Sequence, residues 1–175
     1  MDIAPPAHAY AHVSEDGTRT QTVYEHLHNT AVLAAGFGKA FGAAEQAYLA
    51  GMLHDIGKYS AAFQRRLAGS TERVDHSTAG AQEARKRRDL PAALAIAGHH
   101  GGIPDCGNLN DAADDTTLQG RLKRKLPTYD EWQREIAPPP AKPPAWAVSD
   151  STTAAFYTRM LYSCLVDADF QDTQN

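Results

Sequence analysis

Apolar residues recur at helical spacing through most of this chain, and that periodicity limits the possible folds more than any other feature. Leu27, Ala31 and Ala34 follow the three-to-four-residue interval of a single helix face. Comparable patterns predict helices at 24–41, 44–56, 76–88, 90–102 and 149–170. No alternating apolar–polar run is long enough to predict a strand, and no internal repeat is visible. The sequence therefore predicts an all-α fold.

Two segments interrupt the helical pattern. Residues 1–20 contain Pro5-Pro6 and a turn-like stretch, and we expect an irregular N-terminal arm there. Residues 103–149 begin with a polar stretch, continue into a helix-forming stretch broken at Pro127, and end in a proline-rich stretch that favours extended chain. We expect one domain over 21–173, with a peripheral insertion at about 103–149.

Composition narrows the class of protein. The 175 residues carry a formal net charge of −4. This charge argues against a basic protein that coats nucleic acid, but it does not argue against a nuclease. No run of about 18 apolar residues predicts a membrane span, and the first residues do not resemble a secretory signal. Cys106 and Cys164 lie in dissimilar contexts. A reduced cytoplasmic protein is the simpler interpretation.

Histidines and aspartates at the ends of the predicted helices suggest a metal site. They have small or apolar neighbours, as buried positions do, and a buried polar group needs a partner. A shared metal ion would satisfy all of them. The candidates in chain order are His26 or His28, His54, Asp55, His76, His99, His100, and Asp167 or Asp169. The members of each alternative pair are two residues apart and cannot share a helix face.

The ligand types indicate the chemistry. Imidazole and carboxylate groups without clustered thiolates suit Fe, Mn, Co, Ni or Zn, and Mg is also compatible. One carboxylate can bridge two such ions, and a pair of ions can promote hydrolysis of a phosphodiester. Lys58 follows Asp55 by three residues and shares its helix face. We therefore expect Asp55 and Lys58 to be catalytic, with Lys58 stabilising charge on phosphoryl oxygens.

The order and wording of these segments resemble the HD phosphohydrolase superfamily. More narrowly, they resemble the HD nuclease domain of the CRISPR-associated nuclease-helicase of type I systems. The matching phrases are "EHLHNTAVLA", "AGMLHDIGKYSAAFQRRL", "DHSTAGA", "AGHHGG" and "RMLYSCLVDADFQDT". They cover roughly 24–103 and 156–173 and leave the insertion unexplained.

The resemblance implies an HD-domain helical bundle with a central two-metal site. It selects His26 over His28 and Asp169 over Asp167. In the implied ligand set, one ion is held by His26, His54, Asp55 and Asp169, and the other by Asp55, His76, His99 and His100. It further implies an endonuclease that cuts single-stranded DNA in antiviral defence. Its partners would be a helicase domain or subunit and an RNA-guided surveillance complex.

Several expectations are less specific. No nucleotide-binding G-x-x-x-x-G-K-[ST] loop is present, so the sequence shows no helicase motif of its own. We therefore expect a nuclease domain excised from a larger nuclease-helicase, in preference to a stand-alone nuclease subunit. Ser77, which could instead cap a helix, and Arg65 and Arg66 are the candidate substrate contacts. The basic runs at 85–88 and 121–125 are either solvated faces or tracks for a DNA backbone. His8 and His12 are expected to be solvent-exposed in the N-terminal arm.

Two rival functions fit parts of the sequence. An HD phosphohydrolase acting on small nucleotides would use the same ligands in a more enclosed site. Its cyclic-dinucleotide branch expects a "GYP" phrase where this chain has "GGIPDCGN". A helical scaffold that only docks partners would need no metal, but the complete ligand set argues against a degenerate scaffold.

Overall fold

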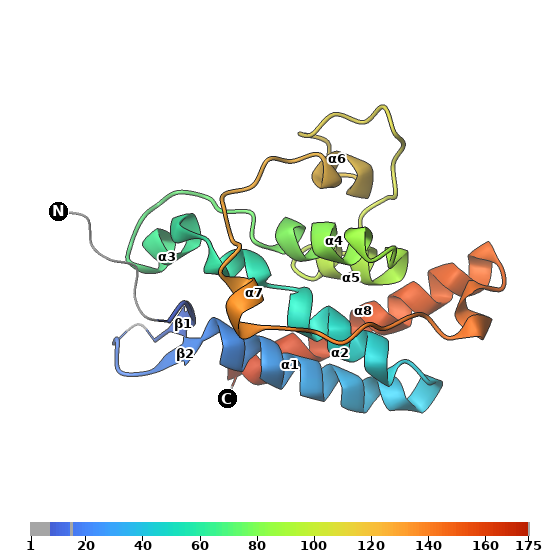
Figure 1. The fold of residues 1–175 in the computed structure, drawn as a ribbon, viewed down its shortest axis with the longest axis horizontal. Coiled ribbons are helices and arrows are strands. Elements are labelled where there is room, and N and C mark those ends of the chain that lie inside the picture. Colours follow the sequence, from blue (N-terminus) through green and yellow to red (C-terminus); the bar gives the residue numbers. More distant parts are fainter. Residues whose placement is uncertain (1–7, 15, 175) are drawn as a thin grey trace.

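Helices make up the structured core of the chain, as the sequence predicts. The computed structural model describes residues 8–14 and 16–174, and within that part a two-stranded hairpin is the only sheet (Figure 1). The helices form a bundle in which most of the buried hydrophobic side chains belong to one continuous cluster. The all-α prediction is therefore confirmed.

The N-terminal arm is more ordered than expected. Strand β1 (Tyr10–Val13) pairs antiparallel with β2 (Thr20–Thr22). The prediction of an irregular arm is therefore wrong for this stretch, and residues 1–7 lie outside the described residues. Strands of four and three residues are too short to show a convincing alternation of apolar and polar side chains. Pairing with each other and packing against α1 and α3 decide their conformation.

Two antiparallel helices form the base of the bundle. Helix α1 (Val23–Gly38) begins with a capping box in which Thr22 and Glu25 satisfy each other's backbone amides. The 3-10 turn η1 (Lys39–Phe41) leads into α2 (Ala44–Leu53), which packs along α1. The two axes approach closely because α2 carries Gly51 against the backbone of Ala31, where a Cβ would clash.

The chain breaks sharply after α2. Where the sequence predicted helix as far as Ile56, α2 ends at Leu53 and is followed by the 3-10 helix η2 (Ile56–Tyr59) and then α3 (Ala61–Leu67). Ser60 caps α3 by accepting a hydrogen bond from the amide of Phe63. The break places His54 and Asp55 at a joint between helices, where both side chains are buried.

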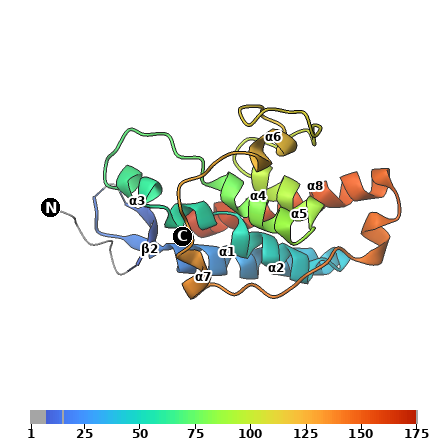
Figure 2. The same ribbon diagram turned by 45° about the horizontal axis from the view of Figure 1, so that its top comes forward.

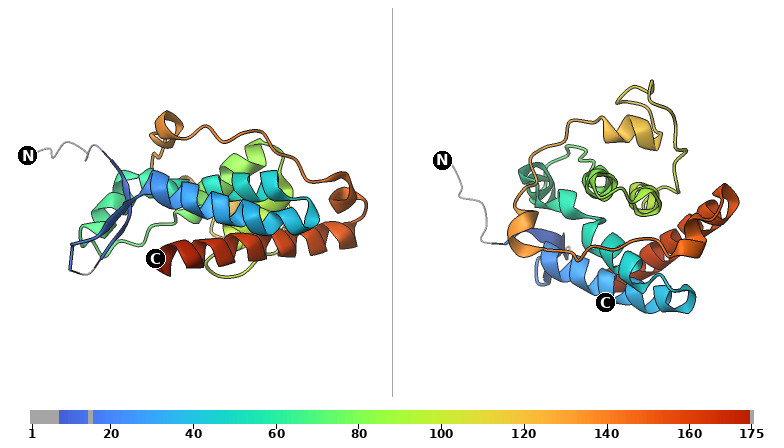
Figure 3. Two further views of the ribbon diagram at one scale, coloured as in Figure 1. Left: turned by 90° about the horizontal axis from the view of Figure 1, so that it is seen from below. Right: turned by 45° about the vertical axis from the view of Figure 1, so that its right-hand side comes forward.

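A second helix pair covers the first. Helix α4 (Ser77–Lys86) packs on α5 (Leu90–Gly98), and α5 also contacts the long C-terminal helix α8 (Ser151–Gln174). Figure 3 shows α8 running along α1, and α5 packs against both α8 and α2. The sequence offers Ser77 and Thr78 as possible caps of α4, but the N-cap residue is His76. The carboxylate of Asp75 accepts the Thr78 amide instead.

The segment at 103–149 contributes to the core. Its elements are α6 (Leu118–Leu122), α7 (Trp132–Glu135) and the 3-10 turn η3 (Ala145–Val148), much shorter helices than the sequence suggested. Helix α6 lies over α4 and α5 (Figure 2). The proline-rich chain then runs without regular structure along the bundle towards α8 (Figure 1). The residues of segment 103–149 that are buried in the core cluster are Leu118, Trp132, Ile136 and Ala147.

The buried face of α8 is rotated from the one we expected. Helical spacing of its apolar residues predicts a buried face formed by Phe156, Met160, Leu161, Cys164 and Leu165. Leu161, Cys164 and Leu165 are buried, but Phe156 is 59% exposed. Tyr157 takes its place in the core, where its ring packs edge-on against Phe41 and Trp146. Aromatic residues supplied by distant segments therefore set the orientation of this helix.

Cys106 is exposed, Cys164 is buried, and both are free thiols. Among the described residues, no helix combines the length and the apolar character needed to cross a bilayer.

Candidate metal centre

The carboxylate of Asp55 lies between two groups of histidines. Its side chain is 1% exposed at the joint between α2 and η2. Oδ2 faces His26 Nε2 at 3.4 Å and His54 Nε2 at 3.6 Å. Oδ1 faces His99 Nε2 at 3.3 Å and His76 Nε2 at 3.6 Å. The two oxygens of the Asp55 carboxylate therefore face two different pairs of imidazoles.

The first group is assembled from three helices. His26 comes from α1, His54 from the end of α2, and Asp169 from α8. Asp169 Oδ1 lies 3.4 Å from His26 Nε2 and 3.6 Å from His54 Nε2. The two imidazoles approach each other to 3.2 Å between their Nε2 atoms. Asp55 and Asp169 therefore both face the imidazoles of His26 and His54.

The second group comes from the facing ends of α4 and α5. His76 precedes α4, and His99 and His100 follow α5. His76 Nε2 and His100 Nε2 are 2.7 Å apart, and the rings of His99 and His100 lie 3.9 Å apart between centroids. His99 is buried, whereas His100 is exposed. The second group therefore forms the solvent-facing edge of the cluster.

Hydrogen bonds on the outer ring nitrogens orient these histidines. His54 Nδ1 lies 2.7 Å from the carbonyl of Gly51, and His99 Nδ1 lies 2.7 Å from the carbonyl of Ile96. An Nδ1–H that donates to a carbonyl leaves the lone pair on Nε2, and that atom faces Asp55 in both residues. Metal-binding histidines are held in this way.

The cluster fits a divalent metal. Among the described residues, Asp55 Oδ1 and His99 Nε2 are buried without a hydrogen-bond partner, and Asp55 Oδ2 is satisfied by an ion pair with Lys58 at 2.8 Å rather than by a hydrogen bond of acceptable geometry. Stranding such atoms costs roughly 1–3 kcal/mol each, more when the group is charged. Three overlapping sets of side chains could each hold an ion: Asp55 with His76, His99 and His100; His26 with His54 and Asp55; and His54 with His99 and Asp169.

The electrostatics keep the two carboxylates, His76 and His100 in ligand form, whereas the hydrogen bonds of His26 to Asp172 and Asp55 raise its pKa against the effect of burial. Burial alone would raise the pKa of Asp55, but Lys58 and the neighbouring histidines hold it well below its ordinary value. Asp169 is held low in the same manner by His54 and His26, against the effect of burial. Burial lowers the pKa of His76, and burial together with His99 lowers that of His100 to about 4. At neutral pH the carboxylates are charged and these two imidazoles are neutral.

Comparison with protein families identifies the domain. The HD domain model matches residues 23–130, more than half of the chain. This chain belongs to the HD domain family. A search of curated proteins gave no match. Membership, together with the ligand cluster, supports a metal-dependent phosphohydrolase.

The lysine of this HD domain is buried against the central carboxylate. Lys58 is 5% exposed, and its Nζ lies 2.8 Å from Asp55 Oδ2, so it is paired with the central carboxylate. His12 from β1 lies 3.3 Å from the same Nζ through its Nε2. The expectation of a solvent-exposed His12 is therefore wrong. Its ring packs edge-on against His26, and burial and Lys58 lower its pKa to about 4.

Asp172 also contacts the ligand cluster, although the sequence pattern did not indicate it. Asp172 Oδ2 lies 2.7 Å from His26 Nδ1, so Asp172 orients the imidazole whose Nε2 faces Asp55. Asp167, the alternative ligand on α8, is exposed and does not take this supporting role. The available signal was spacing, because Asp172 follows Asp169 by one helical turn on α8 and shares its face.

The three candidate substrate contacts lie in different settings. Ser77 is buried and lines a cavity of about 560 Å³ together with His100 and Arg121. Arg65 and Arg66 are exposed on α3, where Arg65 pairs with Glu72 at 3.6 Å. Ser77 therefore lies beside the ligand cluster, whereas the two arginines belong to the outer surface.

Proposed function

We propose that this HD domain is a metal-dependent nuclease that hydrolyses phosphodiesters of single-stranded DNA in type I CRISPR interference. The observation that carries the proposal is the Asp55 carboxylate, which presents one oxygen to each of two ligand groups. This is the arrangement expected of a residue that bridges two ions. The resemblance of the flanking phrases to the CRISPR-associated branch supports the substrate class.

The residues would act as follows. His26, His54 and Asp169 would hold one ion, and His76, His99 and His100 the other, with Asp55 shared. When bound, such a pair of ions supplies Lewis acidity towards a phosphodiester and makes water more acidic. The cations compatible with these ligands are Mn, Fe, Co, Ni, Zn and Mg.

The remaining roles belong to the chain itself. Lys58 adds a positive charge beside Asp55 and would stabilise negative charge developing on the phosphate. His12, neutral near pH 7, accepts a hydrogen bond from the Lys58 ammonium and limits its orientation. Ser77 would contact a phosphate at the exposed edge of the cluster, and Arg65 and Arg66 would guide the strand by charge.

The partners follow from the same proposal. A helicase domain or subunit would supply single-stranded DNA, and an RNA-guided surveillance complex would select the target. Reconstitution with both should direct cleavage to the displaced strand of a guide-RNA-opened duplex. Cleavage that is equal with and without the surveillance complex would contradict this recruitment.

Circular single-stranded DNA offered beside a panel of small nucleotides tests the substrate class. Each reaction is run in turn with Mn²⁺, Co²⁺, Ni²⁺ and Mg²⁺. We expect the circle to be cut, which requires an endonuclease. Turnover of nucleotides with an intact circle would instead establish the small-nucleotide phosphohydrolase.

Asp55→Ala tests the residue that carries the proposal. We expect loss of DNA cleavage with the helical circular-dichroism spectrum retained. Asp167→Ala is the matched control, because Asp167 is an exposed aspartate on α8. Metal-dependent cleavage by Asp55→Ala at the wild-type rate would refute the assignment.

A further inference from the structure

One arginine of the insertion contacts both helix ends that carry the second ligand group. Arg121 Nη2 donates to Ser77 Oγ at 2.6 Å, and its Nε donates to Thr78 Oγ1 at 3.0 Å. Both partners are in the first turn of α4, directly after His76. Its Nη1 donates to the carbonyl of Ala97, two residues before His99. A single guanidinium therefore bridges the start of α4 and the end of α5.

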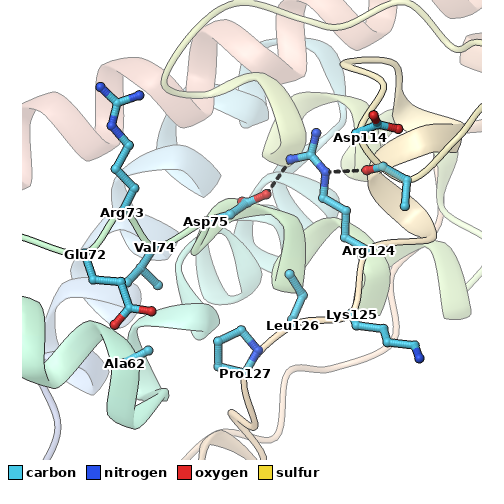
Figure 4. Close-up of a pocket in the computed structure, with 11 residues that line it drawn as sticks. Ala62, Glu72, Arg73, Val74, Asp75, Asp114, Arg124, Lys125, Leu126 and Pro127 are labelled. Carbon is cyan, nitrogen blue, oxygen red and sulfur yellow. Dashed lines mark hydrogen bonds and ion pairs between the residues drawn. The ribbon is translucent and has the colours of Figure 1, made fainter.

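A carboxylate and a second arginine hold this bridge in place. Asp75 accepts from the Thr78 amide at 3.1 Å and from Thr78 Oγ1 at 2.7 Å, which fixes the turn around His76. Arg124 Nη1 donates to Asp75 Oδ2 at 2.6 Å, and Arg121 Nη2 lies 3.5 Å from Oδ1. Figure 4 shows the guanidinium of Arg124 directed at Asp75, both among the residues that line a cavity of about 430 Å³.

The insertion itself is fastened at the same place. Arg124 also donates to the carbonyls of Ala113 at 2.9 Å and Asp115 at 3.1 Å. From α4, Gln82 donates to the carbonyl of Arg124 at 3.0 Å. The side chain of Arg121 is only 15% exposed, so its charge and hydrogen bonds are partly shielded from water. These contacts make the docked insertion a fixed part of the domain.

We propose that Arg121, supported by Asp75 and Arg124, is a positioning residue for the second ligand group. It holds the start of α4 and the end of α5 at the spacing at which His76, His99 and His100 face Asp55. The first group is built from α1, α2 and α8, and Arg121 does not contact it. This inference rests on the proposed two-ion centre, and it gives the insertion a role within that centre.

Metal binding in two backgrounds tests the role. His26→Ala removes a ligand of the first group only, and His76→Ala a ligand of the second group only. Adding Arg121→Ala to His26→Ala should weaken the remaining Mn²⁺ or Co²⁺ binding roughly 10- to 100-fold, the usual effect of losing a residue that orients ligands. Adding it to His76→Ala should change the remaining affinity by less than about twofold. Isothermal titration calorimetry and the visible spectrum of the Co²⁺ protein measure both.

The controls separate positioning from folding. Arg134→Ala removes an exposed insertion arginine whose ion-pair partner in the described part of the chain is Glu131 alone, and it should leave both affinities unchanged. Arg121→Lys keeps the charge but cannot reach all partners, and it should give an intermediate loss. Arg124→Gln weakens the support indirectly and decides the question if Arg121→Ala does not fold. Equal losses in both backgrounds, or no loss in either, would overturn the positioning role.

The same titrations separate this inference from the proposed substrate. If the wild-type protein binds ions but cuts no DNA, the nuclease proposal is wrong. The positioning role of Arg121 is then still decided by the titrations of the His26→Ala and His76→Ala variants. A wild-type protein that binds no divalent ion would overturn both.

Discussion

Asp55 concentrates the chemistry of the molecule in one side chain. It is buried, charged at neutral pH and paired with Lys58, and it faces histidines on both sides. Burying a carboxylate among imidazoles without an ion leaves polar atoms poorly satisfied, so the site is more favourable with cations bound. The residues around it divide into those that face Asp55 and those that orient them.

Alanine substitutions of Asp169 and Asp167 test which aspartate of α8 is a metal ligand. Asp169→Ala should lower metal-dependent cleavage by at least about 100-fold, which corresponds to about 2.7 kcal/mol of transition-state stabilisation. Asp167→Ala should cleave at the wild-type rate, because that side chain is exposed. Single-turnover rates with Mn²⁺ measure both variants, and the reverse order would assign the ligand to Asp167.

Asp172 should act on metal affinity through His26. Asp172→Ala removes the acceptor of the Nδ1–H and frees the ring to turn, so affinity should fall roughly 10- to 100-fold. Asp172→Asn keeps an acceptor and should lose less. Calorimetric titration checks the order wild type, Asn, Ala. An unchanged affinity in the alanine variant would show that packing alone holds His26.

Close approach between elements fixes where the ligands meet. The start of α4 lies against the end of α2 because Gly80 has no side chain there, and a Cβ would fall on the carbonyl oxygen of Leu53. This contact sets His76 beside Asp55. Gly36, by contrast, is exposed on α1 with open space around it.

These two glycines should respond in opposite directions to the same substitution. Gly80→Ala should destabilise the fold by about 1–3 kcal/mol through overpacking. Gly36→Ala should stabilise it by about 0.5–1 kcal/mol, because alanine loses less backbone entropy in a helix. Urea unfolding followed by circular dichroism gives both values. If Gly80→Ala were neutral, α4 and α2 would not be in tight contact.

The ligand cluster brings together residues from most of the long helices of the bundle. Its ligands come from α1, the end of α2, the start of α4, the end of α5 and α8, so bound ions would link nearly every large helix. Ions that bind the folded state and not the unfolded chain raise stability by mass action.

Divalent metal should therefore raise the melting temperature. At a free Mn²⁺ or Ni²⁺ concentration of about 100 times Kd, the gain is about 2.7 kcal/mol. For a chain of this size that is a rise of roughly 5–11 °C. Differential scanning calorimetry with and without chelator measures it. Asp55→Ala should show little rise, and an equal rise in that variant would mean that the ions bind elsewhere.

Helical periodicity and the order of the histidines and aspartates determined the fold class and the candidate ligands, because both are local patterns written along the chain. Tertiary structure decided everything that depends on distant segments meeting. The strands at 10–13 and 20–22 are too short to signal themselves, and His12 enters the site only because the hairpin packs on α3. Asp172 matters because α8 lies against α1, and Arg121 because α6 docks on α4 and α5. A side chain's role in such a site depends on what it faces, and that is set by packing rather than by sequence neighbours.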